Sequence, residues 1–194
     1  MRGDKRERIL RVLLNSNEAL SKNEISKRAE CTRQWVILLL KDLEKKKLVK
    51  GTAPIDRKKI IQYWISISKK PKKYRDYMVK GPLALLKKTK LDYALTTYQA
   101  ENLVQHHLFP SRIELYIKED DLDKWHSLMT KNGLYGKGNA RIIIADEHVM
   151  HSKRIINGLS VVSIPQLIVD LTHEGGPCKE AAEMLMERLY VQRI

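Results

Sequence analysis

The chain lacks the long apolar runs that mark membrane spans and secretion signals. No apolar run among its 194 residues approaches the ~20 residues that a membrane-spanning helix needs. The first ten residues, MRGDKRERIL, carry charge where a signal peptide would have its apolar core. We therefore expect a soluble, cytoplasmic protein with no membrane partner.

Cysteine is also scarce, with only Cys31 and Cys178, which are far apart and form no CxxC pair. We expect free, mostly buried thiols and not a disulfide framework. The pairs His106-His107 and His148/His151 have no carboxylate or Cys at a metal-ligand spacing. These residue types therefore predict no metal and no cofactor.

Acidic residues are also scarce, but only in the first 80 residues of the chain. Residues 1–80 hold 23 Lys and Arg against 9 Asp and Glu, a net charge of +14, whereas residues 81–194 hold 14 of each. Such segregation indicates that the first part faces a polyanion. An anionic membrane would call for a basic amphipathic helix with a broad apolar face, and no segment has that pattern. Nucleic acid is the partner that remains.

Apolar periodicity then predicts three helices at the start of the chain. Residues 5–15 place their apolar side chains on one helical stripe. The sequence Ser21-Lys22-Asn23-Glu24 fits a capping box that opens a short helix over 22–29. Thr32 is a second candidate N-cap, for a helix that runs to about Lys46. The buried stripe of this third helix is expected to be Val36, Leu39, Leu40 and Leu43.

A change of periodicity follows the third helix. The sequences KLVKGTA (47–53) and KKIIQYWISIS (58–68) predict two strands, joined by a turn at 53–57. Alternation in the second strand would place Ile61, Tyr63, Ile65 and Ile67 on one face. Three helices followed by a β-hairpin is the element order of a winged helix-turn-helix, which docks its second motif helix in the major groove of DNA.

The third helix supplies the candidate base-reading residues. Arg33 can pair bidentately with guanine and Gln34 with adenine, and both lie in the first turn. Basic residues of the hairpin suit phosphate contacts, although a charged turn in water would look the same. The outward Ile37 and Leu38 leave open a helix packed against protein. The predicted DNA-binding residues are Lys22, Asn23, Thr32, Arg33, Gln34, Ile37, Lys41, Arg57, Lys58 and Lys59.

The remaining chain predicts a basic linker and a second domain. Residues 69–80 are polar and basic and contain a proline, although Tyr74, Tyr77 and Met78 could pack and make the linker a structured one. Residues 81–194 alternate between strand-like and helical patterns, so the fold class is α+β: a winged helix over 1–68 and a mixed α/β domain over 81–194. Strands are expected at 93–97, 112–118, 141–145 and 159–164. Helices are expected at 98–106, 120–131, 165–173 and 179–190.

Enzymatic signals in the second part are weak. The cluster Glu119-Asp120-Asp121-Leu122-Asp123 could hold Mg²⁺, but acidic residues at a helix start also satisfy its free N–H groups. The glycines of residues 132–138 precede a strand and lack the Gly-Lys-Ser/Thr of a phosphate loop. We predict that the chain is not an enzyme.

Several segments of the second part resemble one protein family. The run YALTTYQAENL (93–103), followed by Pro110 and RIELYI, is similar to a conserved segment and strand of AbiEi-type antitoxins. Gly138-Asn139 and the ending VVSIPQLIVDLTHEGGPCKEAAEMLMERL (161–189) are similar to the same family. The resemblance implies a non-enzymatic repressor of its own operon in a type IV toxin–antitoxin system. Such an antitoxin counteracts a nucleotidyltransferase toxin without needing to bind it.

The sequence as a whole predicts a sequence-specific regulator that binds double-stranded DNA. Two alternatives stay open. One is a plasmid or viral replication or transcription regulator of the same architecture, and the other is a Mg²⁺-dependent nucleic-acid-modifying enzyme that uses Asp121 and Asp123. The operator and the oligomeric state, a homodimer included, are not determined by the sequence.

Overall fold

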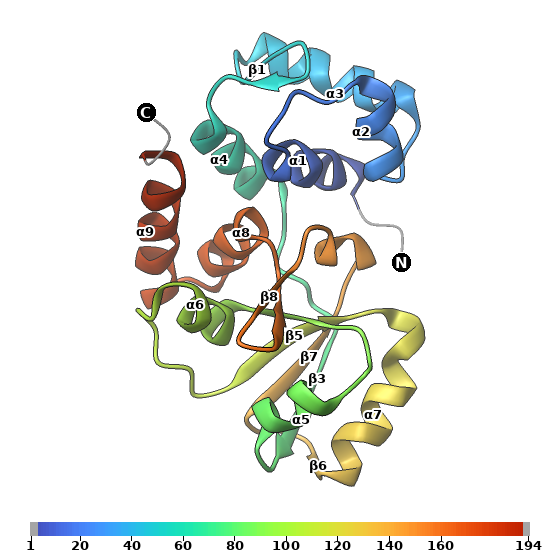
Figure 1. Ribbon diagram of the computed structural model, residues 1–194, viewed down its shortest axis with the longest axis vertical. Helices are drawn as coiled ribbons and strands as arrows, with labels where there is room; N and C mark the ends of the chain where they lie inside the picture. The colour runs from blue at the N-terminus through green and yellow to red at the C-terminus, as the bar shows by residue number, and fades with distance from the viewer. Residues whose placement is uncertain (1–3, 192–194) are drawn as a thin grey trace. The chain divides into compact units, whose positions relative to one another are not determined.

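The computed structural model describes residues 4–191, which divide into two compact units (Figure 1). Among the described residues, the N-terminal unit comprises residues 4–69 and 186–191, and the C-terminal unit comprises Lys70–Leu185. The first is mainly helical and the second carries a large mixed sheet. The α+β class is therefore confirmed.

The three helices expected at the start of the chain are present as α1 (Lys5–Asn15), α2 (Lys22–Arg28) and α3 (Arg33–Lys45). The capping box of α2 is confirmed, because Glu24 N–H donates to Ser21 Oγ and Ser21 N–H donates to Glu24 Oε2. Thr32 is the N-cap of α3, and its Oγ1 accepts from Trp35 N–H at 3.5 Å. The predicted stripe of α3 is buried as well. Local sequence signals thus fix the starts of both helices.

The second strand of the expected hairpin is wrong, because those residues form a helix. Only β1 (Val49–Lys50) and β2 (Ala53–Pro54) pair, and α4 (Arg57–Ile67) follows at once. Asp56 is the N-cap of α4, where its Oδ1 accepts from Lys59 N–H at 3.0 Å. The buried residues Ile60, Ile61 and Trp64 follow a helical and not an alternating spacing.

Trp64 explains why the helical arrangement of α4 is favoured. Its side chain is fully buried, its Nε1–H donates to Glu7 Oε2 at 3.0 Å, and the Arg11 guanidinium lies 5.1 Å from its ring centre. A strand would turn every second side chain away from this core. Burial of a large aromatic ring with its polar N–H satisfied outweighs the strand preference of the isoleucines.

The C-terminal unit is built on a seven-stranded sheet of order β6-β3-β7-β5-β4-β9-β8. Strands β5 and β7 are parallel, as are β4 and β9, and the other neighbours are antiparallel. All five residues of β5 are buried, so this strand is the centre of the unit. The strands are β3 (Tyr74–Val79), β4 (Ala94–Thr96), β5 (Ile113–Ile117), β6 (Gly133–Tyr135), β7 (Ala140–Ile144), β8 (Arg154–Ile156) and β9 (Leu159–Val161).

Strand β3 lies where the sequence predicts a linker. Residues 74–79 pair with β7 on one side and β6 on the other, and Tyr77 and Val79 are buried. Its polar side chains also bond across the sheet: Asp76 lies opposite Arg141 on β7 and accepts a hydrogen bond from Arg141 Nε at 2.7 Å. The expected linker over 69–80 is therefore wrong for most of its length.

Helices complete the C-terminal unit, and all four that the sequence predicts are confirmed with small shifts at their ends. Helix α5 and the two short 3-10 turns η1 and η2 were not predicted. None of the helices within residues 4–191 is long and apolar enough to span a membrane. The helical elements are α5 (Pro82–Lys88), α6 (Thr97–Gln105), η1 (Glu119–Asp121), α7 (Leu122–Lys131), η2 (Glu147–Met150), α8 (Ile164–Glu174) and α9 (Pro177–Val191).

Candidate functional site

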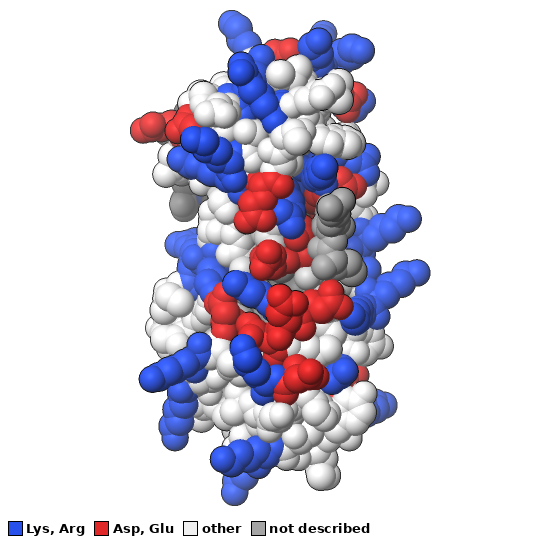
Figure 2. Space-filling view, turned by 90° about the vertical axis from the view of Figure 1, so that its right-hand side faces the viewer, with Lys and Arg blue, Asp and Glu red and all other residues white. Residues whose placement is uncertain are grey.

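The outward face of α3 carries the residues predicted to read DNA. Arg33, Gln34 and Lys41 are exposed, and Ile37 between them is half-buried. Gln34 and Lys41 lie on the side of the helix away from its buried stripe, Ile37 lies beside them, and Arg33 is the first residue of the helix. Figure 2 shows that Lys and Arg side chains project from the N-terminal unit, at the top of the view. The structure therefore leaves this face of α3 open to solvent within its own unit.

Several cations near this face have no partner among residues 4–191. Lys22, Arg33 and Lys41 form no hydrogen bond or ion pair with a described residue, and Lys22 and Asn23 lie exposed in the first turn of α2. Thr32 differs, because its hydroxyl already caps α3. A surface cation without a protein partner can bind a nucleic-acid phosphate, which releases counterions and adds affinity.

Two large apolar side chains also lie exposed on α3. Trp35 is 43% and Leu38 55% exposed, and the Lys5 ammonium lies 5.2 Å from the Trp35 ring centre. Trp35 was not singled out from the sequence, although its place in the first turn could have indicated it. Exposed aromatic and apolar groups of this kind can contact a protein partner or, in a helix that binds DNA, the thymine methyl group.

Arg57 is not a wing residue, contrary to the expectation. It is the first residue of α4, and its guanidinium donates to Leu14 O at 2.8 Å and to Ser16 O at 2.5 Å. These carbonyls lie at the C-terminal end of α1, in its last turn and at its C-cap, where the C=O groups have no partner within the helix. Arg57 therefore joins α4 to α1. Lys59 pairs with Asp56 at 3.6 Å, whereas Lys58 is exposed and has no described partner.

The structural boundary also reduces the charge asymmetry inferred from the sequence. Residues 1–69 and 186–194 together hold 20 Lys and Arg against 9 Asp and Glu, net +11, and residues 70–185 hold 17 against 14, net +3. Part of the basic segment belongs to the C-terminal unit, where β3 and its flanking residues lie. The N-terminal unit nevertheless keeps most of the excess positive charge.

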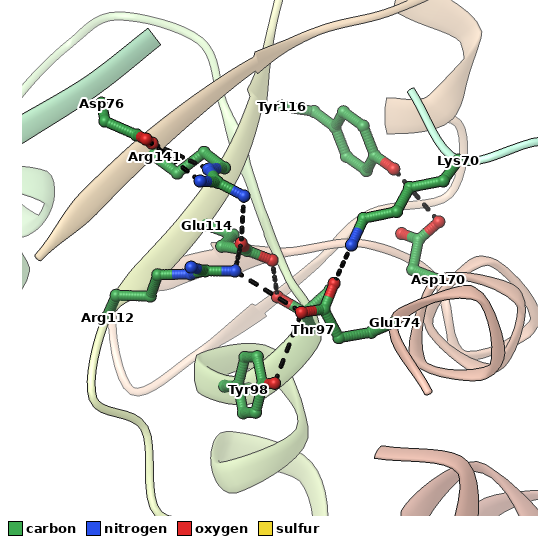
Figure 3. A network of polar contacts seen from close by, with 10 residues as sticks. All are labelled: Lys70, Asp76, Thr97, Tyr98, Arg112, Glu114, Tyr116, Arg141, Asp170 and Glu174. Carbon is green, nitrogen blue, oxygen red and sulfur yellow. Dashed lines mark hydrogen bonds and ion pairs between the residues drawn. The ribbon is translucent and has the colours of Figure 1, made fainter. Parts of the chain in front are cut away.

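A buried polar network occupies the centre of the C-terminal unit (Figure 3). Glu114 on β5 is only 1% exposed, and its carboxylate lies 2.6 Å from Arg112 Nη2 and 3.6 Å from Arg141 Nη1. Thr97 Oγ1 donates to Glu114 Oε2 at 2.5 Å. Thr97 has φ +48°, which is strained for a β-branched residue. The bond to Glu114 helps to hold this conformation.

Glu174 extends the network from the end of α8. It pairs with Lys70, lies 3.5 Å from Arg112 Nη2, and accepts from the Tyr98 hydroxyl at 3.4 Å. Burial acts to raise the pKa of Glu174, but Lys70 and Arg112 outweigh it and hold that pKa below its usual value. Burial raises the pKa of Tyr98, with Cys178 and Glu174 adding to the effect, so its hydroxyl stays protonated.

Asp170 forms a neighbouring cluster on α8. Its carboxylate accepts from Thr96 Oγ1, from Tyr116 Oη at 3.1 Å and from Gln166 Nε2 at 2.7 Å. Every one of these donors is buried. The cluster therefore ties α8 to β4 and β5, and its carboxylate is satisfied by structural bonds.

The acidic cluster considered as a metal site is spread over η1 and the start of α7. Glu119 pairs with Lys73, and Asp121 accepts from Lys124 Nζ at 2.8 Å. Asp121 is the N-cap residue of α7, but its side chain makes no capping bond, so the capping expected there is wrong for Asp121. Among residues 4–191, no three His, Cys, Asp or Glu side chains are grouped so as to hold a metal ion.

The glycine-rich loop has a structural explanation. A Cβ on Gly133 would lie 2.0 Å from Met78 O, and one on Gly138 would lie 2.4 Å from Tyr77 O. Both residues are glycine because the backbone of β3 passes directly beside them. This loop leads into β7, as the sequence predicts.

No protein-family model matches the chain, and neither a curated protein nor a solved structure is significantly similar to it.

Proposed function

We propose that the chain is a sequence-specific regulator that binds double-stranded DNA, with its N-terminal unit acting as a winged helix-turn-helix. The observation that carries this proposal is the outward face of α3, where Arg33, Gln34 and Lys41 are exposed and without described partners. Helix α2 precedes α3 by a corner of a few residues, which is the spacing of a helix-turn-helix. Docked by its N-terminal end, α3 would bring Arg33 and Gln34 to the base edges.

The wing is short in this proposal. The end of β1 offers Lys50 and the start of α4 offers Lys58, both exposed and unpaired within the described chain. We assign phosphate contacts to these two lysines and to Lys41, in place of Arg57. A phosphate contact adds affinity for any duplex and no sequence discrimination.

The C-terminal unit is proposed to act without catalysis. The carboxylates Glu119 and Asp121 of the acidic cluster are engaged by lysines, which favours a structural role over Mg²⁺ binding. An antitoxin role, and autorepression with it, rests on the resemblance of residues 93–103 and 161–189. A nucleotidyltransferase toxin encoded in the neighbouring reading frame would support that role, and a neighbourhood of plasmid or viral replication genes would support the alternative regulator.

The salt dependence of DNA binding tests the phosphate contacts. If about six phosphates are neutralised, log K should fall against log salt with a slope of about −5, and Lys41→Ala or Lys50→Ala should each flatten it by about one unit. Fluorescence anisotropy of a labelled duplex at several salt concentrations measures the slope. Lys131→Ala, at the exposed end of α7, is the matched control and should leave the slope unchanged. Equal flattening by all three variants would refute the assignment.

A further inference from the structure

A pocket of about 270 Å³ opens within the C-terminal unit. It lies between the start of α5, the first turn of α6 and the segment that leads into β5. Its wall is largely apolar. Four polar residues line it, and one of them, Asn139, is hydrogen-bonded to the backbone of Val79 in β3. The lining residues that matter are Pro82, Leu83, Gln99, Ser111, Arg112 and Ile113.

Gln99 is the first sign that the pocket takes a ligand. Gln99 lines the pocket and is 6% exposed, yet its side chain forms no hydrogen bond with any described residue. Buried amide groups are normally hydrogen-bonded, because an unpaired one costs free energy. The neighbouring Asn139 shows the contrast, since both ends of its amide bond to the backbone of Val79. The Gln99 amide can therefore form hydrogen bonds with a ligand in the pocket.

Arg112 supplies donors on the same wall. Its contacts with Glu114 and Glu174 all use Nη2, while Nε is buried without a hydrogen-bond partner and Nη1 has no partner among the described residues. A guanidinium has five N–H donors and no acceptor, so it requires an acceptor oxygen. Glu114 and Glu174 offset part of its positive charge, which favours a ligand with one negative charge over a dianion.

The start of α6 favours the same charge. Helix α6 has nine residues, Gln99 lies in its first turn, and no side chain caps its N-terminal N–H groups. The positive end of a helix dipole stabilises an anion placed near it. This effect adds to the unpaired side chains of Gln99 and Arg112.

We propose that the pocket binds a small organic monocarboxylate. The carboxylate oxygens accept from the Gln99 amide and the Arg112 guanidinium, and the organic group packs against Pro82, Leu83 and Ile113. The pocket is close to the size of small-ligand sites, which are mostly apolar with a few placed polar groups. The proposal is independent of DNA binding.

Benzoate is a suitable probe, with benzamide as its neutral counterpart and inorganic phosphate as an anion without an apolar group. Saturation-transfer NMR on the full chain should show saturable binding of benzoate with a Kd of about 1 mM or tighter, as its few atoms allow. Benzamide and phosphate should bind at least about tenfold more weakly. Equal or tighter binding of benzamide or phosphate would overturn the carboxylate assignment, and no saturable binding of benzoate would overturn the site.

Two variants locate the binding. Gln99→Leu keeps the size of the side chain but removes its amide, and should weaken benzoate binding about tenfold. Ala84→Trp fills the pocket from the exposed surface of α5 and should abolish binding. Ser127→Trp, on the exposed face of α7, is the matched control and should bind benzoate like the native chain. Native-like benzoate affinity in folded Ala84→Trp, checked by circular dichroism, would refute the site.

Discussion

Replacing Glu114 by Ala is expected to lower the free energy of unfolding of the C-terminal unit by about 3–5 kcal/mol. The carboxylate is buried on the central strand β5 and contacts the cations Arg112 and Arg141. Removing it leaves these guanidiniums with less compensating charge and leaves a cavity in the sheet. It also removes the acceptor of Thr97 Oγ1, which helps to hold a strained backbone conformation.

Urea unfolding followed by circular dichroism measures this effect through the transition midpoint. Asp123→Ala is the matched control, because Asp123 is exposed on α7 and has no partner in the described chain. Asp123→Ala should change the free energy of unfolding by no more than about 0.5 kcal/mol. A Glu114→Ala chain as stable as the Asp123→Ala chain would contradict the role of the network.

Arg57→Ala is expected to lower the free energy of unfolding of the N-terminal unit by about 2–3 kcal/mol without changing the salt slope of DNA binding. Its guanidinium donates to two carbonyls at the end of α1, and hydrogen bonds from a charged donor are stronger than neutral ones. Leu14 and Ser16, which carry these carbonyls, are buried, so water replaces the lost bonds poorly.

Lys58→Ala is the control for Arg57→Ala, because Lys58 is the next residue of α4, is exposed and has no partner among residues 4–191. The Lys58→Ala variant should unfold with a free energy within about 0.5 kcal/mol of the native chain, and its salt slope should be flatter by about one unit. Chemical unfolding and DNA titration of both variants, below their unfolding transitions, separate the two roles. A flattened slope in Arg57→Ala with native stability would restore Arg57 as a phosphate contact.

The elements that the sequence predicts well are those set by nearby residues. The capping box at Ser21 and Glu24 and the N-cap at Thr32 act within one helical turn, so their signal survives in the sequence alone. The strand predicted over 58–68 is wrong because the alternating residues do not match the buried ones, which are Ile60, Ile61 and Trp64. Asp56, a good N-cap residue directly before Arg57, was the available signal for the helix.

Features that depend on distant residues were missed. Strand β3 looks like a linker because Asp76 and Arg75 are polar, and its place follows only from pairing with β7 far along the chain. The network around Glu114 joins residues from Lys70 to Glu174, which no local pattern connects. A glutamate within the apolar run IELYI of a fully buried strand was the one sequence signal for it.

The base-reading role of α3 is the central claim, and binding to two DNAs tests it most directly. Selection from a random duplex library with the full chain first defines its preferred site. Arg33→Ala and Gln34→Ala should then each weaken binding to that site by ~1–3 kcal/mol, about 5- to 150-fold, and leave binding to random duplex nearly unchanged. Equal losses on both DNAs, or a native chain that selects no preferred sequence, would contradict the account.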